Sequence, residues 1–170
     1  MNSKTGCGVV SGEALFGAFI QPCIEGRHEE SVRCVKAGRA ETFSEECLLR
    51  YVSFTETGES PTRQMLKEDF PIPCADLVRF AASMGIENED CVWSHDVVAL
   101  FWRAEHHKDD PGCRVLAGRV LNVFHEHHVV LVTLGDEEVV PVVNLLRLTL
   151  RAGDIVSVHK MVICEKREEE

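Results

Sequence analysis

Between residues 114 and 163, short runs rich in valine and leucine alternate with polar or glycine-containing gaps. This spacing constrains the fold more than any other feature of the chain, because β-branched residues favour strands and short strands at regular intervals are typical of antiparallel sandwiches and barrels. The expected strands are 115–124, 128–134, 137–143 and 155–163, and residues 144–150 fit a helical turn or a short strand. The sequence therefore predicts a small antiparallel β-barrel.

Individual residues refine this barrel. Gly118 predicts a bulge or bend inside the first strand, and Pro141 indicates an edge or a bulge in the third. Neighbouring valines such as Val142 and Val143 point to opposite faces of a strand, so both faces need cover, from the N-terminal helices or from a partner chain. The expected core positions are Leu148, Leu150, Val156, Val158 and Met161.

The part before the run 109–112 is mixed. Helices are expected at 94–107, with Ser94 as N-cap, at 74–84 and at 44–54, whereas residues 5–40 stay ambiguous. The predicted fold class is α+β, an acidic, mostly helical N-terminal part packed on a C-terminal small antiparallel β-barrel. Its boundaries are 1–110, 111–163 and a charged tail at 164–170. The expected buried helix positions are Leu77, Val78, Ala81, Val97, Val98, Phe101, Trp102 and Ala104.

Composition narrows the class of protein. The chain has 170 residues, 45% of them apolar and 27% charged, which is typical of a globular protein and excludes a disordered chain or a coiled-coil rod. Its net charge of −10 argues against binding nucleic acid or an anionic membrane by bulk charge. Because no apolar run is long enough to span a membrane, we expect a soluble, intracellular protein, cytoplasmic or nuclear.

The sequence contains eight cysteines and eight histidines, all of them potential metal ligands, yet no two cysteines form a CxxC pair. The set Cys91, His95, His106, His107 and Cys113 matches no standard finger, and a helix between His95 and His106 would separate them by roughly 20 Å. The loop from His125 to His128 fits a solvated hairpin turn. We therefore expect buried free thiols, with no metal and no cofactor, and keep a metal-binding protein as an alternative.

Catalytic motifs are absent from the sequence: it contains no GxSxG elbow, no phosphate-binding loop and no GxGxxG. The sequence therefore predicts a protein that is not an enzyme and has no catalytic residues. A small enzyme of unrecognised type remains an alternative.

The phrase LVTLGDEEVVPVVNLLRL resembles the central strands of a Tudor barrel, and LRAGDIVSVHKMV resembles the last strand of S1- or cold-shock-like barrels of the OB class. Residues 97–113 followed by a barrel also resemble the N-terminal region of germline small-RNA-pathway helicases. The resemblance implies a nucleic-acid-handling context. However, residues 114–163 hold one aromatic, Phe124, and no net charge, which disfavours a methyl-lysine cage and base stacking.

These observations predict a non-catalytic interaction or adaptor subunit, within an RNA-pathway or genome-maintenance complex, whose partner is another protein in a hetero- or homo-oligomer. The expected partner contacts are Trp93, Trp102, Val139, Val142, Leu145 and Leu148. The alternative is direct RNA or DNA binding by an OB/S1-like barrel through Arg114, Arg119, Arg147, Arg151 and Lys160.

Overall fold

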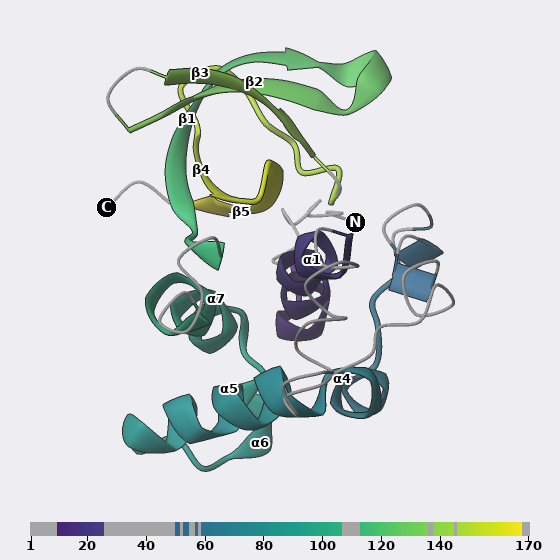
Figure 1. Ribbon diagram of the computed structural model, residues 1–170, viewed down its shortest axis with the longest axis vertical. Coiled ribbons are helices and arrows are strands. Elements are labelled where there is room, and N and C mark those ends of the chain that lie inside the picture. Colours follow the sequence, from purple (N-terminus) through teal and green to yellow (C-terminus); the bar gives the residue numbers. More distant parts are fainter. Residues whose placement is uncertain are drawn as a thin grey trace, which may run out of the picture.

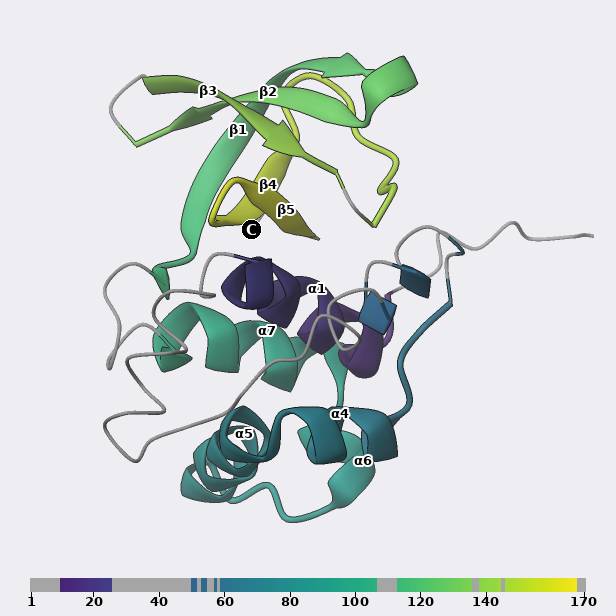
Figure 2. The same cartoon turned by 45° about the vertical axis from the view of Figure 1, so that its right-hand side comes forward.

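The computed structural model describes residues 10–25, 50–51, 53–54, 57, 59–106, 113–135, 138–144 and 146–167. Helices form one layer and a five-stranded sheet forms the other, with helix α1 (Gly12–Glu25) lying next to the sheet (Figures 1 and 2). The predicted α+β class is confirmed. None of the helices in the described part of the chain has the length and hydropathy to cross a membrane.

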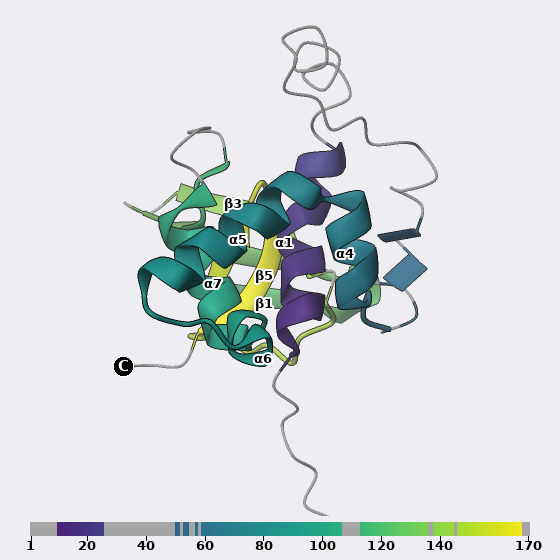
Figure 3. The same ribbon diagram turned by 90° about the horizontal axis from the view of Figure 1, so that it is seen from below.

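Four further short helices are described in the helical layer: α4 (Arg63–Asp69), α5 (Pro71–Ser83), α6 (Glu89–Val92) and α7 (His95–Ala104). Side chains cap the first turns of α4 and α6 but not those of α5 and α7. Thr62 caps α4 by accepting a hydrogen bond from the Met65 amide, and Asn88 caps α6 in the same way. Helices α1 and α7 lie closer to the sheet than α4, α5 and α6 do (Figures 1 and 2), and Figure 3 shows the helices from the side opposite the sheet.

Helix α1 is held at its N-terminal end by polar contacts with the other helices. Ser11 accepts a hydrogen bond from the Ala14 amide, and Glu13 receives the Arg63 guanidinium at 2.8 Å. Arg63 also pairs with Asp90 at 3.0 Å, so one side chain joins α1, α4 and α6. The hydrogen bond with Glu13 raises the pKa of Arg63.

The sheet contains β1 (Leu116–Phe124), β2 (Val129–Leu134), β3 (Glu138–Val143), β4 (Ile155–His159) and β5 (Val162–Arg167). The strand order is β1-β2-β3-β5-β4, and β4 pairs back onto β1, so the order closes on itself. Neighbours are antiparallel except β3 and β5, whose parallel contact is one residue pair, Val143 with Val162. Most of the outer edge of β3, including Pro141, therefore carries no ladder partner among the described strands.

Two apolar cores lie on either side of the joint between the layers. The larger one gathers α1, α4, α5 and α7 around Phe16, Phe19 and Trp102, and it extends to Val162 and Cys164 of β5. The smaller one fills the inside of the sheet with side chains such as Val132, Val156 and Ile163. Strand β5 belongs to both cores, so it is the strand through which the helices and the sheet are packed together.

Several expectations need correction at the C-terminal end. The single strand predicted at 155–163 is two strands, because Lys160 and Met161 both have positive φ values, 48° and 68°, and turn the chain. Residues 164–167, expected in a charged tail, belong to β5, where Cys164 is fully buried. Met161, expected in the core, lies at this turn and is 44% exposed.

Other differences are local. The register shift in β1 lies between Val120 and Asn122 and not at Gly118, where a side chain would instead press on Leu134. Val78, expected to be buried in α5, is 46% exposed because Leu77 and Ala81 form the inward side. Residues 144–150 form neither a helix nor a strand where they are described. The helix expected at 44–54 lies partly outside the described residues; positions 50, 51, 53 and 54 are helical.

Candidate metal centre

Four side chains with metal-binding atoms meet where the helical layer joins the sheet. Cys23 lies in the last turns of α1, His106 follows α7, Cys113 precedes β1, and His159 is the last residue of β4. One ligand atom from each of these residues lies within 4.8 Å of all the others. Two thiol sulfurs and two imidazole nitrogens are a donor set that tetrahedral zinc favours.

The spacing of the donors matches a tetrahedron around one ion. The Cys23 sulfur lies 3.7 Å from the Cys113 sulfur, 3.6 Å from His106 Nε2 and 3.7 Å from His159 Nε2. Zinc bonds of about 2.3 Å to sulfur and about 2.05 Å to nitrogen place two sulfurs about 3.8 Å apart, and a sulfur and a nitrogen about 3.6 Å apart. The three separations from the Cys23 sulfur are therefore those of a tetrahedral zinc site, and all four donor atoms lie within 4.8 Å of one another.

His159 is oriented by its second ring nitrogen. Nδ1 lies 2.9 Å from the carbonyl oxygen of Phe19, and because a carbonyl can only accept, Nδ1 carries the proton. The lone pair of Nε2 is then directed toward the cluster. Fixing the tautomer of a ligating histidine through its other nitrogen is the usual arrangement at metal sites.

Trp102 packs against both histidines. Its ring centroid lies 4.0 Å from that of His106 and 5.8 Å from that of His159, and its other contacts include a stacked ring, that of Phe19, at 5.3 Å. The indole is fully buried. It therefore limits the rotation of the two imidazoles and excludes water from one side of the cluster.

The centre is largely buried, and hydrogen bonds within it act on the pKa of Cys113. Cys23, Cys113 and His159 are buried, and His106 is the half-buried member through which solvent approaches. The hydrogen bond with Cys23, together with those of His106 and His159, outweighs the opposing effect of burial and lowers the pKa of Cys113 below its usual value, a shift that favours the thiolate.

Cys164 lies close by in β5 but has a different environment. Its sulfur faces the carbonyl oxygens of Ala18 and Val162, at 3.7 Å and 3.6 Å. Burial raises the pKa of this thiol well above its usual range, so Cys164 stays protonated. It is a packing residue beside the cluster and provides a matched control for it.

The local sequence explains how α1 and β4 present their donors. Leu15, Phe16, Phe19 and Cys23 recur at helical spacing along α1, so the buried face of the helix carries Cys23 into the joint. The last four residues of β4 are all buried: Val156 and Val158 face the inner core of the sheet, whereas His159, one residue out of phase, faces α1. Thus the apolar patterns that build the core also place two of the four donors.

Two of the four residues of this cluster were predicted from the sequence as candidate metal ligands. His106 and Cys113 were candidates, but their expected companions are elsewhere: Cys91 is exposed, His95 lies beside Asp96, and His107 lies outside the described residues. Cys23 and His159 were missed, since they stand 83 and 53 residues from His106 in sequence. The signal that could have found them is a histidine closing a valine-rich strand and a cysteine on the apolar face of a helix.

The residues expected to contact a partner are not gathered in one place. Trp93, Trp102 and Val142 are buried at 2%, 0% and 1% exposure and pack in the two cores. Leu148 is partly buried against the inner core of the sheet, whereas Val139 is 53% exposed on β3. Leu145 lies outside the described residues. Of the members of this set that the structure describes, Val139 alone offers a large exposed side chain.

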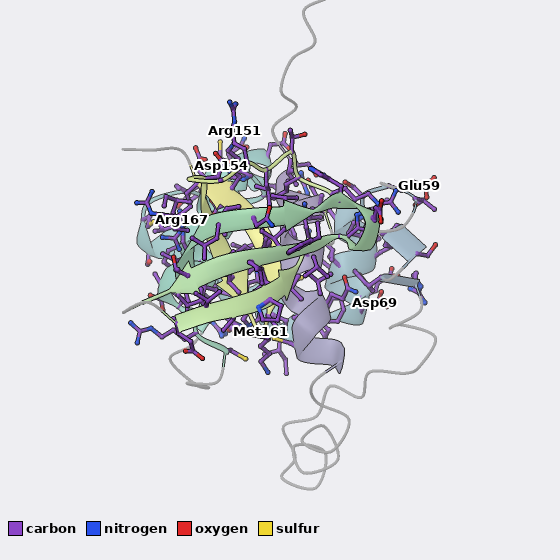
Figure 4. The ribbon with its side chains drawn as sticks, turned by 90° about the horizontal axis from the view of Figure 1, so that it is seen from above. Glu59, Asp69, Arg151, Asp154, Met161 and Arg167 are labelled. Atoms are coloured by element: carbon purple, nitrogen blue, oxygen red, sulfur yellow. The ribbon has the colours of Figure 1, made fainter. Side chains whose placement is uncertain are left out.

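The basic residues proposed for nucleic acid are also spread out. Arg119 donates to the Gly153 carbonyl, next to the turn that carries Arg151, and Figure 4 shows Arg151 beside Asp154. Arg147 lines a cavity of about 250 Å³ bounded by α1 and Tyr51. Because Leu116 pairs with Val158, Arg114 and Lys160 lie toward the opposite end of β1 from Arg119.

The chain was compared with protein-family models, curated proteins and solved structures. No protein-family model, no curated protein and no solved structure matches the chain.

Proposed function

We propose that this chain is a structural zinc protein, in which one Zn²⁺ held by Cys23, His106, Cys113 and His159 joins the helical layer to the sheet. The observation that carries the proposal is the convergence of four donors within 4.8 Å, three of them 3.6–3.7 Å from the Cys23 sulfur as a tetrahedral zinc site requires. With four protein ligands the coordination shell is closed, which is the arrangement of structural zinc sites and not of catalytic ones. The proposed role of the ion is therefore structural and not catalytic.

The ion would tie together parts of the chain that are distant in sequence. Cys23 stands 90 residues from Cys113 and 136 from His159, and the three belong to α1, the segment before β1, and β4. Apart from the hydrogen bond of His159 with the Phe19 carbonyl, the packing of α1 against the sheet is mainly apolar and centred on β5. Removing the ion should thus weaken this joint first, before either core is lost.

Metal content of the purified full-length chain tests the proposal. We expect one zinc per chain in the wild type and in Cys91→Ser, the matched control at an exposed cysteine, and much less in Cys113→Ser. Replacing zinc by Co²⁺ in the wild type should give the intense visible bands of a tetrahedral site with thiolate ligands. A folded wild-type protein that takes up neither ion would overturn the proposal, whatever the folding of the variant.

We further propose that the zinc-braced sheet serves as the interaction surface of an adaptor subunit in a nucleic-acid-handling complex. The closed order β1-β2-β3-β5-β4 is consistent with the five-stranded OB barrels that the sequence resembles. The outward residues of β2 and β3 are uncharged: Val129, Leu131, Thr133, Val139, Pro141 and Val143. An uncharged face suits a protein better than a phosphate backbone.

The test compares Val139→Lys, which places a charge on this face, with Glu138→Lys, which changes a residue that is charged already and lies at the end of β3. Cross-linking followed by mass spectrometry should join a defined protein to β2 or β3 in the wild type and in Glu138→Lys, and lose it in Val139→Lys. Binding of a single-stranded oligonucleotide that weakens steeply with salt, and that Arg119→Glu abolishes, would replace the adaptor proposal by direct nucleic-acid binding.

A further inference from the structure

The two cysteines of the metal centre, Cys23 and Cys113, are close enough to react with each other as well as to bind a metal ion. Their sulfurs lie 3.7 Å apart, and a disulfide needs them to approach to about 2.05 Å. Resting on the zinc site proposed above, we infer that the centre is a redox-sensitive clasp: oxidation by a peroxide joins Cys23 to Cys113 and releases the ion. The disulfide would replace the metal as the link between α1 and the segment before β1.

The reaction balances with one equivalent of hydrogen peroxide. One cysteine thiolate attacks a peroxide oxygen, the O–O bond breaks, and a sulfenic acid and hydroxide form. The second thiolate attacks that sulfur, the S–S bond forms, and the S–O bond breaks with loss of a second hydroxide. Two protons from solvent convert the hydroxides to water, so the two thiolates lose two electrons and the peroxide gains them.

Loss of the ion follows from the loss of its ligands. A disulfide sulfur is a poor ligand because the thiolate charge is gone, and His106 and His159 alone provide two neutral donors. The four-donor shell that closes the site then no longer exists. Reduction of the disulfide by a dithiol restores both thiolates, so the cycle is reversible.

The surroundings favour these two cysteines over the other described ones. Cys74 and Cys164 are buried and direct their sulfurs at backbone carbonyls, at 3.3 Å from Leu66 and 3.7 Å from Ala18 respectively. Cys91 is exposed and lies outside the cluster. Peroxide can reach the pair beside His106, the half-buried member of the centre.

The experiment uses the full-length, zinc-loaded chain and hydrogen peroxide. Zinc release is followed with a colorimetric chelator, and disulfides are mapped by mass spectrometry of non-reduced peptides. We expect one zinc released for each Cys23–Cys113 disulfide, and recovery of zinc binding after dithiothreitol. Cys91→Ser and Cys164→Ala, which leave the four ligands in place, should behave as the wild type does.

Two results separate this inference from the zinc proposal. A chain that carries stoichiometric zinc before treatment, but keeps it at peroxide concentrations that oxidise Cys91, overturns the inference alone. Zinc release with sulfinic or sulfonic acids at Cys23 and Cys113, or with a disulfide to another cysteine, overturns it as well. Absence of zinc from the untreated folded chain would instead overturn the metal site itself.

Discussion

Replacing His159 by alanine should destabilise the protein by an amount that depends on zinc. In metal-free buffer His159→Ala empties a fully buried position and leaves the Phe19 carbonyl without its donor, at a cost of about 3 kcal/mol. At free zinc one hundred times the dissociation constant, the wild type gains about 2.7 kcal/mol more. The variant keeps three of four ligands and gains little, so the difference should widen to about 6 kcal/mol.

Urea unfolding followed by far-ultraviolet circular dichroism, in a chelator and in a zinc buffer, measures both values. His125→Ala is the matched control, because this histidine is exposed at the hairpin between β1 and β2 and should change the free energy of unfolding by less than about 0.5 kcal/mol in either buffer. If the difference between wild type and His159→Ala is the same with and without zinc, His159 is a packing residue and the assignment of the metal centre is wrong.

Three further changes test other parts of the fold. Gly12→Ala should lower the free energy of unfolding by about 2 kcal/mol in a denaturant titration, because the new Cβ would lie 1.8 Å from the Trp93 carbonyl oxygen and force α1 to shift. Burial opposes ionisation of Asp154, but hydrogen bonds from Lys166 and a backbone amide keep its pKa below the usual value. Asp154→Asn should therefore cost about 1 kcal/mol at neutral pH, a difference that shrinks as the pH falls below about 4. Val139→Lys should leave the thermal unfolding temperature within about 2 °C of the wild type, since this side chain is mostly solvated.

The sequence predicted the strands well wherever apolar residues alternate or run together. β1, β2 and β3 begin and end within one residue of the expected positions, because valine-rich runs and the Gly135 turn leave few alternatives. β5 was missed because its second half reads Glu165, Lys166 and Arg167, which resembles a solvated tail. Its burial depends on α1 and α7 lying over it, a contact that no local pattern reveals.

The candidate site was harder to predict for the same reason. Spacing rules for metal ligands work when the donors lie in one or two short segments, as in zinc fingers. Here each donor comes from a separate element, and Cys23 and His159 become neighbours only through the packing of α1 onto the sheet. The sequence correctly predicted a helix between His95 and His106, and the cluster contains His106 but not His95.

The long sequence separations within the metal centre also bear on folding kinetics. Its donors are 83, 90 and 136 residues from Cys23, so the cluster closes only after the helices and the sheet have met. Contacts of such high order form late and cost loop-closure entropy before they return any stabilisation. Zinc should therefore leave the refolding rate almost unchanged and slow unfolding about a hundredfold at one hundred times its dissociation constant. Zinc would therefore slow the unfolding of the native protein without nucleating its folding.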